Sequence, residues 1–163
     1  MEVAVRKARQ GDIPILVRMQ QGLMEHHLAL SKNDAKGREQ RETVANLGAV
    51  WGKWVRKWIA SANGLVLVAT ADGKIVGYSL NFIKDNVPVY KVRKIGYVGD
   101  LFIQKGFRGK GIGSKFKSEA FRWFRKKGMK YASICVHENN REARKLYNVW
   151  GFEDFHIEMR RKL

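Results

Sequence analysis

The sequence predicts an α/β fold, in which helices cover a β-sheet, built as one domain over residues 1–163. Short apolar or alternating segments, typical of strands, are interspersed with longer segments whose apolar residues recur every three or four positions, as in helices. A glycine-rich segment also joins an apolar strand directly to an amphipathic helix. With 45% hydrophobic residues, 163 residues are enough to form one core.

The N-terminal part predicts one strand and two helices. Val3 and Val5 alternate with other residues over 2–7, which favours a strand. Asp12 fits the N-cap of the next helix and Pro14 its first turn. Its apolar face consists of Leu16, Met19, Leu23, His27 and Leu30. A polar loop over 31–38 then precedes a second helix with a stripe of Val44, Leu47, Trp51, Trp54, Val55 and Trp58.

Three strands are predicted in the middle of the chain, over 65–69, 75–83 and 89–103. Asp72 and Gly73 favour a tight hairpin turn between the first two. Gly96 and Gly99 interrupt the third strand, which indicates a β-bulge.

The C-terminal part alternates helices and strands. A helix from Gly111 to Gly128 has an inner face of Ile112, Phe116, Ala120, Trp123 and Phe124. A strand is predicted over 132–136. A short helix then directs Ala143, Leu146, Tyr147 and Trp150 inward, and Gly151 ends it. The alternation over 155–161 predicts a last strand, which completes the order β-α-α-β-β-β-α-β-α-β.

The segment from Asp100 to Ser114 predicts a phosphate-binding loop. Glycines between a strand and a helix allow positive φ angles and a close approach of a ligand. The free amides and the dipole of the helix start favour an anion there. A Walker A loop is excluded, because Gly109-Lys110 is followed by glycine and Gln104 stands where the motif should open. A dinucleotide fingerprint is excluded because it requires glycine at Ser114.

The remaining pattern, Arg108-x-x-Gly111-x-Gly113, resembles the Gln/Arg-x-x-Gly-x-Gly/Ala pyrophosphate loop of the GNAT acetyltransferase superfamily. A second match follows over 136–152, where Asn140 precedes Tyr147 by seven residues and Gly-Phe comes next. The resemblance covers residues 95–155 closely, and earlier residues only in their order of elements.

The resemblance implies a GNAT-like α/β sandwich with a mixed, centrally splayed sheet, and acetyl-CoA as the co-substrate. The pantetheine arm is then expected to add to the backbone of Leu101, Phe102 and Ile103. The pyrophosphate is expected on Arg108, Gly109, Lys110, Gly111, Ile112, Gly113 and Ser114. Asn140 is expected to contact the pantetheine or to cap the helix that carries Tyr147.

The implied reaction is direct attack of a primary amine on the thioester, through a tetrahedral intermediate whose oxyanion a backbone N–H stabilises. Tyr147 matches the family's general acid for the thiolate. The general base stays open between Asp100 and Tyr97, with His27 and Glu25 as weaker candidates. Relatives that acetylate protein N-termini often have glutamate at the position of Cys135, so that likeness is partial.

The net charge of +17 favours polyanionic partners. It suits an amine on an acidic peptide, a protein N-terminus or a ribosome-associated protein. The alternative function is a nucleic-acid- or ribosome-binding module on the same fold with little turnover. The tryptophan stripe, beside Lys53 and Arg56, fits a buried helix face better than a base-stacking surface.

The remaining expectations concern location and assembly. A single cysteine is typical of a cytoplasmic protein, and no apolar run is long enough for a membrane span. The four histidines lack a zinc-like spacing, so no metal is expected. The chain is expected to be a monomer or a homodimer.

Overall fold

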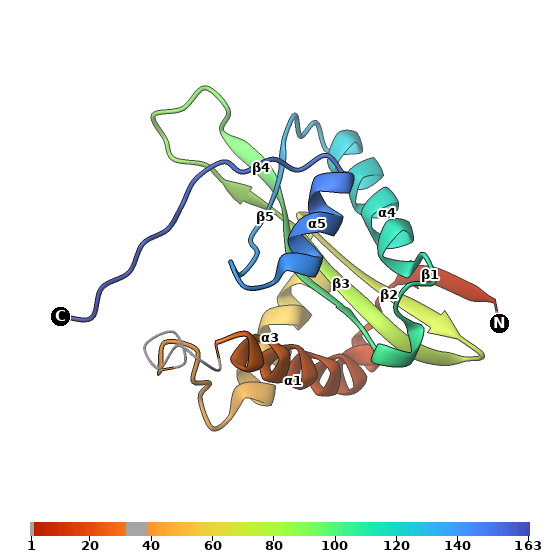
Figure 1. Cartoon of the computed structure of the whole chain (residues 1–163). Helices are drawn as coiled ribbons and strands as arrows, with labels where there is room; N and C mark the ends of the chain where they lie inside the picture. The colour runs from red at the N-terminus through yellow and green to blue at the C-terminus, as the bar shows by residue number, and fades with distance from the viewer. Residues whose placement is uncertain (1, 32–38) are drawn as a thin grey trace.

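The computed structural model describes residues 2–31 and 39–163 (Figure 1). The described residues form a five-stranded sheet in the order β1-β2-β3-β4-β5. Neighbouring strands are antiparallel from β1 to β4, and β5 is parallel to β4. The strands are β1 (Val3–Lys7), β2 (Gly64–Ala71), β3 (Lys74–Asp85), β4 (Lys94–Ile103) and β5 (Ala132–Ile134). The predicted α/β class with a mixed sheet is confirmed.

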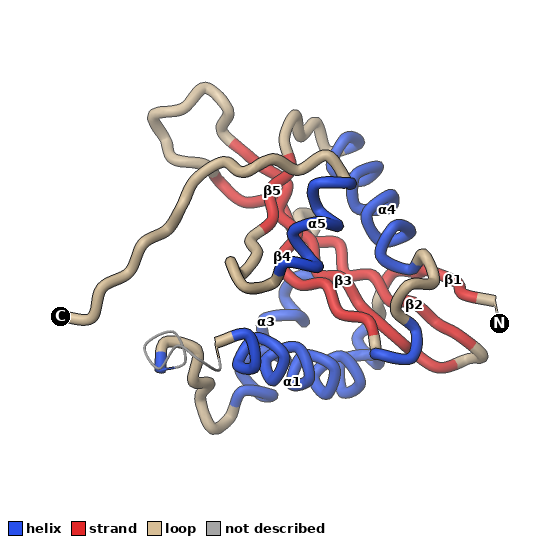
Figure 2. The backbone as a smooth tube through the Cα atoms, in the orientation of Figure 1, coloured by secondary structure: helices blue, strands red, loops and turns tan. Residues whose placement is uncertain are grey.

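Helices cover both faces of this sheet (Figure 2). The helices α1 (Ile13–Leu30) and α3 (Leu47–Ala60) lie on one side, and α4 (Ile112–Lys126) and α5 (Arg141–Val149) on the other. Short 3₁₀ turns, η1 (Gln10–Asp12) and η2 (Lys105–Phe107), precede α1 and α4. No helix among the described residues combines the length and apolar character that a bilayer crossing requires.

The central strand β2 explains why both faces are covered. Val66 and Val68 pack with Leu16 of α1 and Val55 of α3. Their neighbours on β2, which point to the opposite face, pack with Ile112 and Phe116 of α4. Because successive side chains of a strand point to opposite faces, a continuous apolar run must be buried on both.

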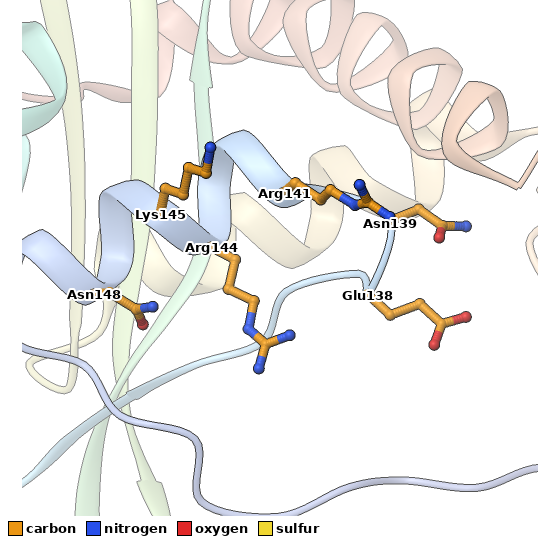
Figure 3. Close-up of a pocket in the computed structure, with 6 residues that line it drawn as sticks. All are labelled: Glu138, Asn139, Arg141, Arg144, Lys145 and Asn148. Atoms are coloured by element: carbon orange, nitrogen blue, oxygen red, sulfur yellow. The ribbon is translucent and has the colours of Figure 1, made fainter.

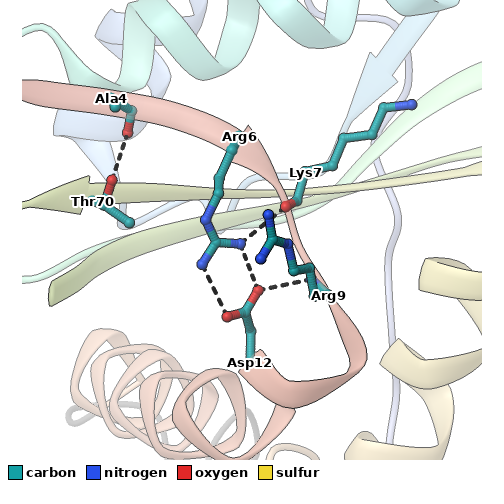
Figure 4. Close-up of polar contacts among 6 residues, drawn as sticks. All are labelled: Ala4, Arg6, Lys7, Arg9, Asp12 and Thr70. Atoms are coloured by element: carbon teal, nitrogen blue, oxygen red, sulfur yellow. Dashed lines mark hydrogen bonds and ion pairs between the residues drawn. The ribbon is translucent and has the colours of Figure 1, made fainter. Parts of the chain in front are cut away.

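Asp12, at the predicted N-cap position, stabilises the turn that leads from β1 into α1. Its carboxylate does not cap α1. Instead it accepts two hydrogen bonds from the Arg6 guanidinium, at 2.7 and 3.0 Å, and one from the Arg9 amide at 2.7 Å (Figure 4). The bonds from Arg6 are the main cause that lowers the pKa of Asp12 below its usual value. This contact fixes the turn between β1 and α1.

The predicted glycine turns are confirmed where φ is positive. Asp72 and Gly73 join β2 to β3 with φ angles of 48° and 77°, as a tight hairpin turn requires. Gly128 and Gly151, just after α4 and α5, have φ angles of 77° and 88°, which suits glycine after a helix end.

The structure corrects the last predicted strand. No strand forms after α5: residues 155–161 run as an extended segment away from the sheet (Figure 2). The apolar residues of the alternation, Phe155, Ile157 and Met159, are 95%, 89% and 89% exposed. The alternation of apolar and polar residues over 155–161 therefore does not produce a strand, because this segment does not pair with a sheet edge.

Several boundaries also differ from the prediction. The second helix begins at Leu47, so Val44 lies before it and is exposed. The third of the middle strands begins at Lys94, after a hairpin loop, and the strand predicted over 132–136 ends at Ile134. Leu146 is exposed on α5 and does not point inward. Most of the predicted loop over 31–38 lies outside the described residues.

Candidate functional site

The glycine-rich loop connects the end of β4 to the start of α4. Gly109 and Gly111 have φ angles of 73° and 76°, a backbone conformation that favours glycine. The amide of Lys115 is bonded to the Gly111 carbonyl, and no side chain of the described residues caps the helix. The amides of Ile112, Gly113 and Ser114 therefore lack partners within the helix. Together with the helix dipole they suit an anion.

The predicted cations of this loop are exposed and only partly engaged. Arg108 folds back so that its Nε donates to the Ile103 carbonyl at 2.9 Å, while its terminal nitrogens have no partner among the described residues. Lys110 lies 5.3 Å from the Phe107 ring centre. Gly113 has a packing role as well, because a Cβ there would lie 3.3 Å from the ring of Trp150, the residue that follows α5.

The strand that leads into the loop separates from its neighbour. β4 pairs with β5 only over Gly96–Val98 and then continues for five residues beyond that pairing. The register against β3 shifts from Asn81↔Val98 to Leu80↔Asp100, which leaves Gly99 as a bulged residue. The bulge predicted from Gly96 and Gly99 is confirmed at Gly99. At Gly96 a Cβ would lie 2.5 Å from the Phe124 ring, so that glycine serves close packing.

The open edge of β4 presents backbone groups. The amide of Gln104 donates to the Val76 carbonyl of β3 at 2.9 Å. Because amide directions alternate along a strand, the amides of Leu101 and Ile103 point to the other edge. That edge lies beyond the last residue paired with β5, so an extended chain with amide groups can add to it.

The second predicted motif forms α5 and the loop before it. The Asn140 Oδ1 accepts a hydrogen bond from the Ala143 amide at 3.2 Å, so this residue caps α5. Tyr147 is half-buried, with its ring centre 5.6 Å from that of Trp150 and 6.2 Å from that of Phe152. Its hydroxyl has no hydrogen-bond partner among the described residues. Burial raises the pKa of Tyr147, so the phenol is protonated at neutral pH.

A carboxyl group lies immediately after the bulge. The Asp100 Oδ2 accepts hydrogen bonds from Trp51 Nε1 at 3.2 Å and from the Tyr78 hydroxyl at 3.4 Å. Burial raises the pKa of Asp100 above its usual value, while the two hydrogen bonds oppose the shift. Burial and the Asp100 carboxylate also raise the pKa of Tyr78. The Oδ1 atom of Asp100 has no partner among the described residues and can accept a proton.

Trp51 and Tyr78 were missed as site residues. The helical stripe predicts Trp51 as a core residue, and it is indeed 8% exposed. The available signal was chemical, since a buried indole N–H requires an acceptor and few acceptors occur in this apolar sequence region.

The environments of the other candidates for the general base, His27, Tyr97 and Glu25, differ from that of Asp100. Burial is the main cause that lowers the pKa of His27. Burial also raises the pKa of Tyr97, which lies under the Lys84 ammonium, 4.0 Å from its ring centre. Glu25 and Cys135 are both exposed. No cluster of three His, Cys, Asp or Glu side chains that could hold a metal ion occurs within residues 2–31 and 39–163.

The β5–α5 loop is attached to the end of α1. The Asn139 amide donates to His137 Nδ1 at 3.1 Å, and the Asn139 side chain donates to the Leu30 carbonyl at 3.1 Å. The buried Ser31 hydroxyl lies 3.3 Å from His137 Nε2. These contacts fix the position at which α5 begins.

A cavity of about 510 Å³ lies on the outer side of α5 (Figure 3). One face of α5 and the preceding loop line it, with Glu138, Asn139, Arg141, Arg144, Lys145 and Asn148. Arg144 also forms an ion pair with Asp154. Because the glycine loop, β4 and Tyr147 do not line this cavity, it is separate from the site that the two motifs predict.

The protein family and the curated relatives that this chain resembles are acetyltransferases. The family model described as "Acetyltransferase (GNAT) family" matches residues 29–152. An uncharacterized N-acetyltransferase of Archaeoglobus fulgidus is 32% identical over 56% of this chain and 62% of its own length. One of Methanocaldococcus jannaschii is 27% identical over 64% of this chain and 46% of its own length. The chain thus spans about half the length of these curated relatives.

A solved structure shares the fold. The crystal structure of a predicted acetyltransferase with acetyl-CoA from Clostridium acetobutylicum superimposes with a TM-score of 0.79. The superposition covers 99% of this chain and 96% of the Clostridium acetobutylicum chain, and the two sequences are 16% identical. The family match spans most of the chain, and the chain therefore belongs to the acetyltransferase (GNAT) family.

Proposed function

We propose that this chain transfers an acetyl group from acetyl-CoA to a primary amine. The observation that supports this proposal most strongly is that an open strand edge leads directly into a loop suited to an anion. β4 leaves β5 after Val98, and five residues later it enters a loop with two positive-φ glycines and a free helix start. An extended arm ending in a diphosphate has both features, and coenzyme A is such a molecule.

The residues present fit this co-substrate. The amides of Ile112, Gly113 and Ser114 would hold the diphosphate, with the Arg108 guanidinium and Lys110 nearby. The Ile103 amide and the Leu101 carbonyl would pair with the pantetheine arm. Acetyl-CoA supplies an acyl group already activated as a thioester, so the protein has to position the groups and move protons.

Asp100 is the proposed general base. It lies next to the open edge of β4, from which we expect the attacking amine to approach. Burial makes this carboxylate more basic than a solvated aspartate, which suits removal of a proton from an ammonium group. Trp51 and Tyr78 hold Oδ2, and this leaves Oδ1 to receive the proton.

Tyr147 is the proposed general acid, and a β4 amide the proposed oxyanion donor. The Tyr147 hydroxyl is protonated and has no competing hydrogen bond among the described residues, so it can donate to the departing thiolate. The Leu101 amide points to the same open edge and can donate to the carbonyl oxygen as negative charge develops there.

The proposed acceptor is an amine on a peptide or protein with acidic residues nearby. The net charge of +17 attracts such a chain and repels free polyamines. This preference is electrostatic, so it should weaken as salt rises.

The test is an acceptor screen that follows free-thiol release from acetyl-CoA. The panel should contain acidic and neutral N-terminal peptides, lysine peptides, polyamines and an aminoglycoside. Thiol release with an amine, at a rate above hydrolysis without amine, supports the proposal. Tight acetyl-CoA binding with no release for any amine would contradict the transferase function.

A further inference from the structure

One end of the sheet carries far more positive charge than acetyl-CoA needs. The β3–β4 hairpin, residues 84–94, projects from this end, and the α4 end with the following turn, residues 125–131, lies beside it (Figure 1). Two contacts immediately beside these segments hold them together: the Gly96 amide, two residues after the hairpin, donates to the Tyr131 carbonyl at 3.1 Å, and Gly96 packs against Phe124, one residue before the second segment. We call residues 84–94 and 125–131 the basic end.

The basic end contains eight cations and one carboxylate. All eight cations are exposed; they are Lys84, Lys91, Arg93, Lys94, Arg125, Lys126, Lys127 and Lys130. The carboxylate, Asp85, pairs with Lys94 at 2.8 Å. The other seven cations form no ion pair with any residue that the structure describes. Such a concentration of like charge repels itself and attracts a polyanion.

Acetyl-CoA binding does not account for this charge, and helix stability accounts for only part of it. The ten residues of β4, at about 3.3 Å each, separate the hairpin from the glycine loop by about 30 Å, and the 15 residues of α4, at about 1.5 Å each, separate the α4 end from it by about 20 Å. Cations favour a helix C-terminus, which can explain Arg125, Lys126 and Lys127. The cations of the hairpin are not on a helix, so they need another explanation.

Two exposed tyrosines and a cavity lie among these charges. Tyr90 on the hairpin is 57% exposed and Tyr131 is 62% exposed. A cavity of about 360 Å³ opens next to the α4 end, lined by Lys126, Lys127 and Trp123 together with residues at the end of β1, the end of α3 and the start of β2. Cations that follow a phosphate backbone, beside aromatic rings that stack on bases, are what single-stranded nucleic acids require.

We propose that the basic end is a docking surface for single-stranded RNA, separate from the acetyl-transfer site. Seven cations without carboxylate partners supply phosphate contacts, and Tyr90 and Tyr131 supply stacking surfaces. Binding here leaves the glycine loop free, so RNA and acetyl-CoA can be held at the same time.

The experiment measures fluorescence anisotropy of a labelled 20-nucleotide oligouridylate at several salt concentrations. The test variant combines Lys91→Glu with Lys130→Glu, because both side chains are exposed and neither forms a hydrogen bond, ion pair or ring contact with any residue that the structure describes. The control combines Lys53→Glu with Lys74→Glu, two exposed lysines on α3 and β3 outside the basic end. Both variants change the net charge equally, so they separate a local site from a general charge effect.

The proposal predicts that the test variant binds about tenfold or more weakly than wild type, with a salt slope reduced by about 1.4 for two lost phosphate contacts. The control should stay within about twofold of wild type. Equal weakening of both variants, or binding of polyglutamate without binding of RNA, would overturn it. Displacement of RNA by coenzyme A would also overturn it, because the RNA would then occupy the glycine loop. The comparison of variants remains valid even if acetyl transfer is never observed.

Discussion

Asp100 connects three elements of the structure through one side chain. It follows the bulge in β4, and its partners Trp51 and Tyr78 come from α3 and β3. A buried carboxyl group is unfavourable when charged, so its proton is held more tightly than in water. The position of Asp100 on a long strand could be predicted from the sequence. Its two partners could not, because they are 49 and 22 residues away and only the packing of α3 on the sheet brings them together.

Asp100→Asn is expected to lower kcat/KM by about 10²-fold or more, because the base is lost. Asparagine can still accept from Trp51, so the fold and acetyl-CoA affinity should be unchanged. In wild type the rate should rise with pH as Asp100 loses its proton, above the usual aspartate pKa. In the variant only the ionisation of the amine should remain in the pH–rate profile. Near-normal kcat/KM with an unchanged profile would exclude Asp100 as the base.

Tyr147→Phe keeps the ring that packs against Trp150 and Phe152 but removes the hydroxyl. The expected loss is about 10²-fold in kcat, with acetyl-CoA affinity unchanged by calorimetry. Tyr131→Phe, on an exposed ring, is the matched control and should transfer at the wild-type rate. If the Tyr147 variant also transfers at that rate, the thiolate receives its proton from another group.

At the scale of elements, the site is formed where β4, the glycine loop and α4 follow one another. This continuity could be predicted, because glycine positions report local backbone geometry that neighbouring residues determine. The extent to which β4 separates from β5 could not be predicted from the residues alone. It depends on β5 ending at Ile134, which the apolar character of the following Cys135 and Val136 did not reveal.

Gly111→Ala is expected to weaken acetyl-CoA binding by roughly 5- to 30-fold. A side chain at a φ of 76° costs about 1–2 kcal/mol, and the loop would leave this conformation when no ligand holds it. Gly106→Ala is the control, since Gly106 has no positive φ and a Cβ there meets no atom within 4 Å. Calorimetry of both variants tests the loop. Equal affinities would show that the positive-φ conformation is not needed for binding.

For the whole molecule, the two faces of the sheet carry the stability and the C-terminal segment does not. The cores on either side consist of residues from α1, α3, β2, β3 and α4. The segment after Asp154 contacts the body through exposed groups, including Lys162 with Glu39 at 3.0 Å. Periodicity predicted a strand for this segment because alternation reports only a local pattern. Whether a sheet edge pairs with that pattern is decided by the rest of the fold.

Truncation after Asp154 is therefore expected to change the free energy of unfolding by no more than about 1 kcal/mol, since exposed ion pairs contribute little. Urea unfolding of the full chain and the truncated chain measures this. A loss of several kcal/mol, or of cooperativity, would show that residues 155–163 pair with the sheet as the alternation predicts.

A titration with acetyl-CoA followed by backbone amide NMR tests the proposed binding site without any variant. We expect the largest shifts at Leu101 and Ile103 on β4 and over 109–114 in the loop and the first turn of α4. Shifts confined to Arg141, Arg144 and Lys145, which line the cavity on α5, would place the ligand on the outer face of that helix. That result, or no shift at all, would contradict the proposed site.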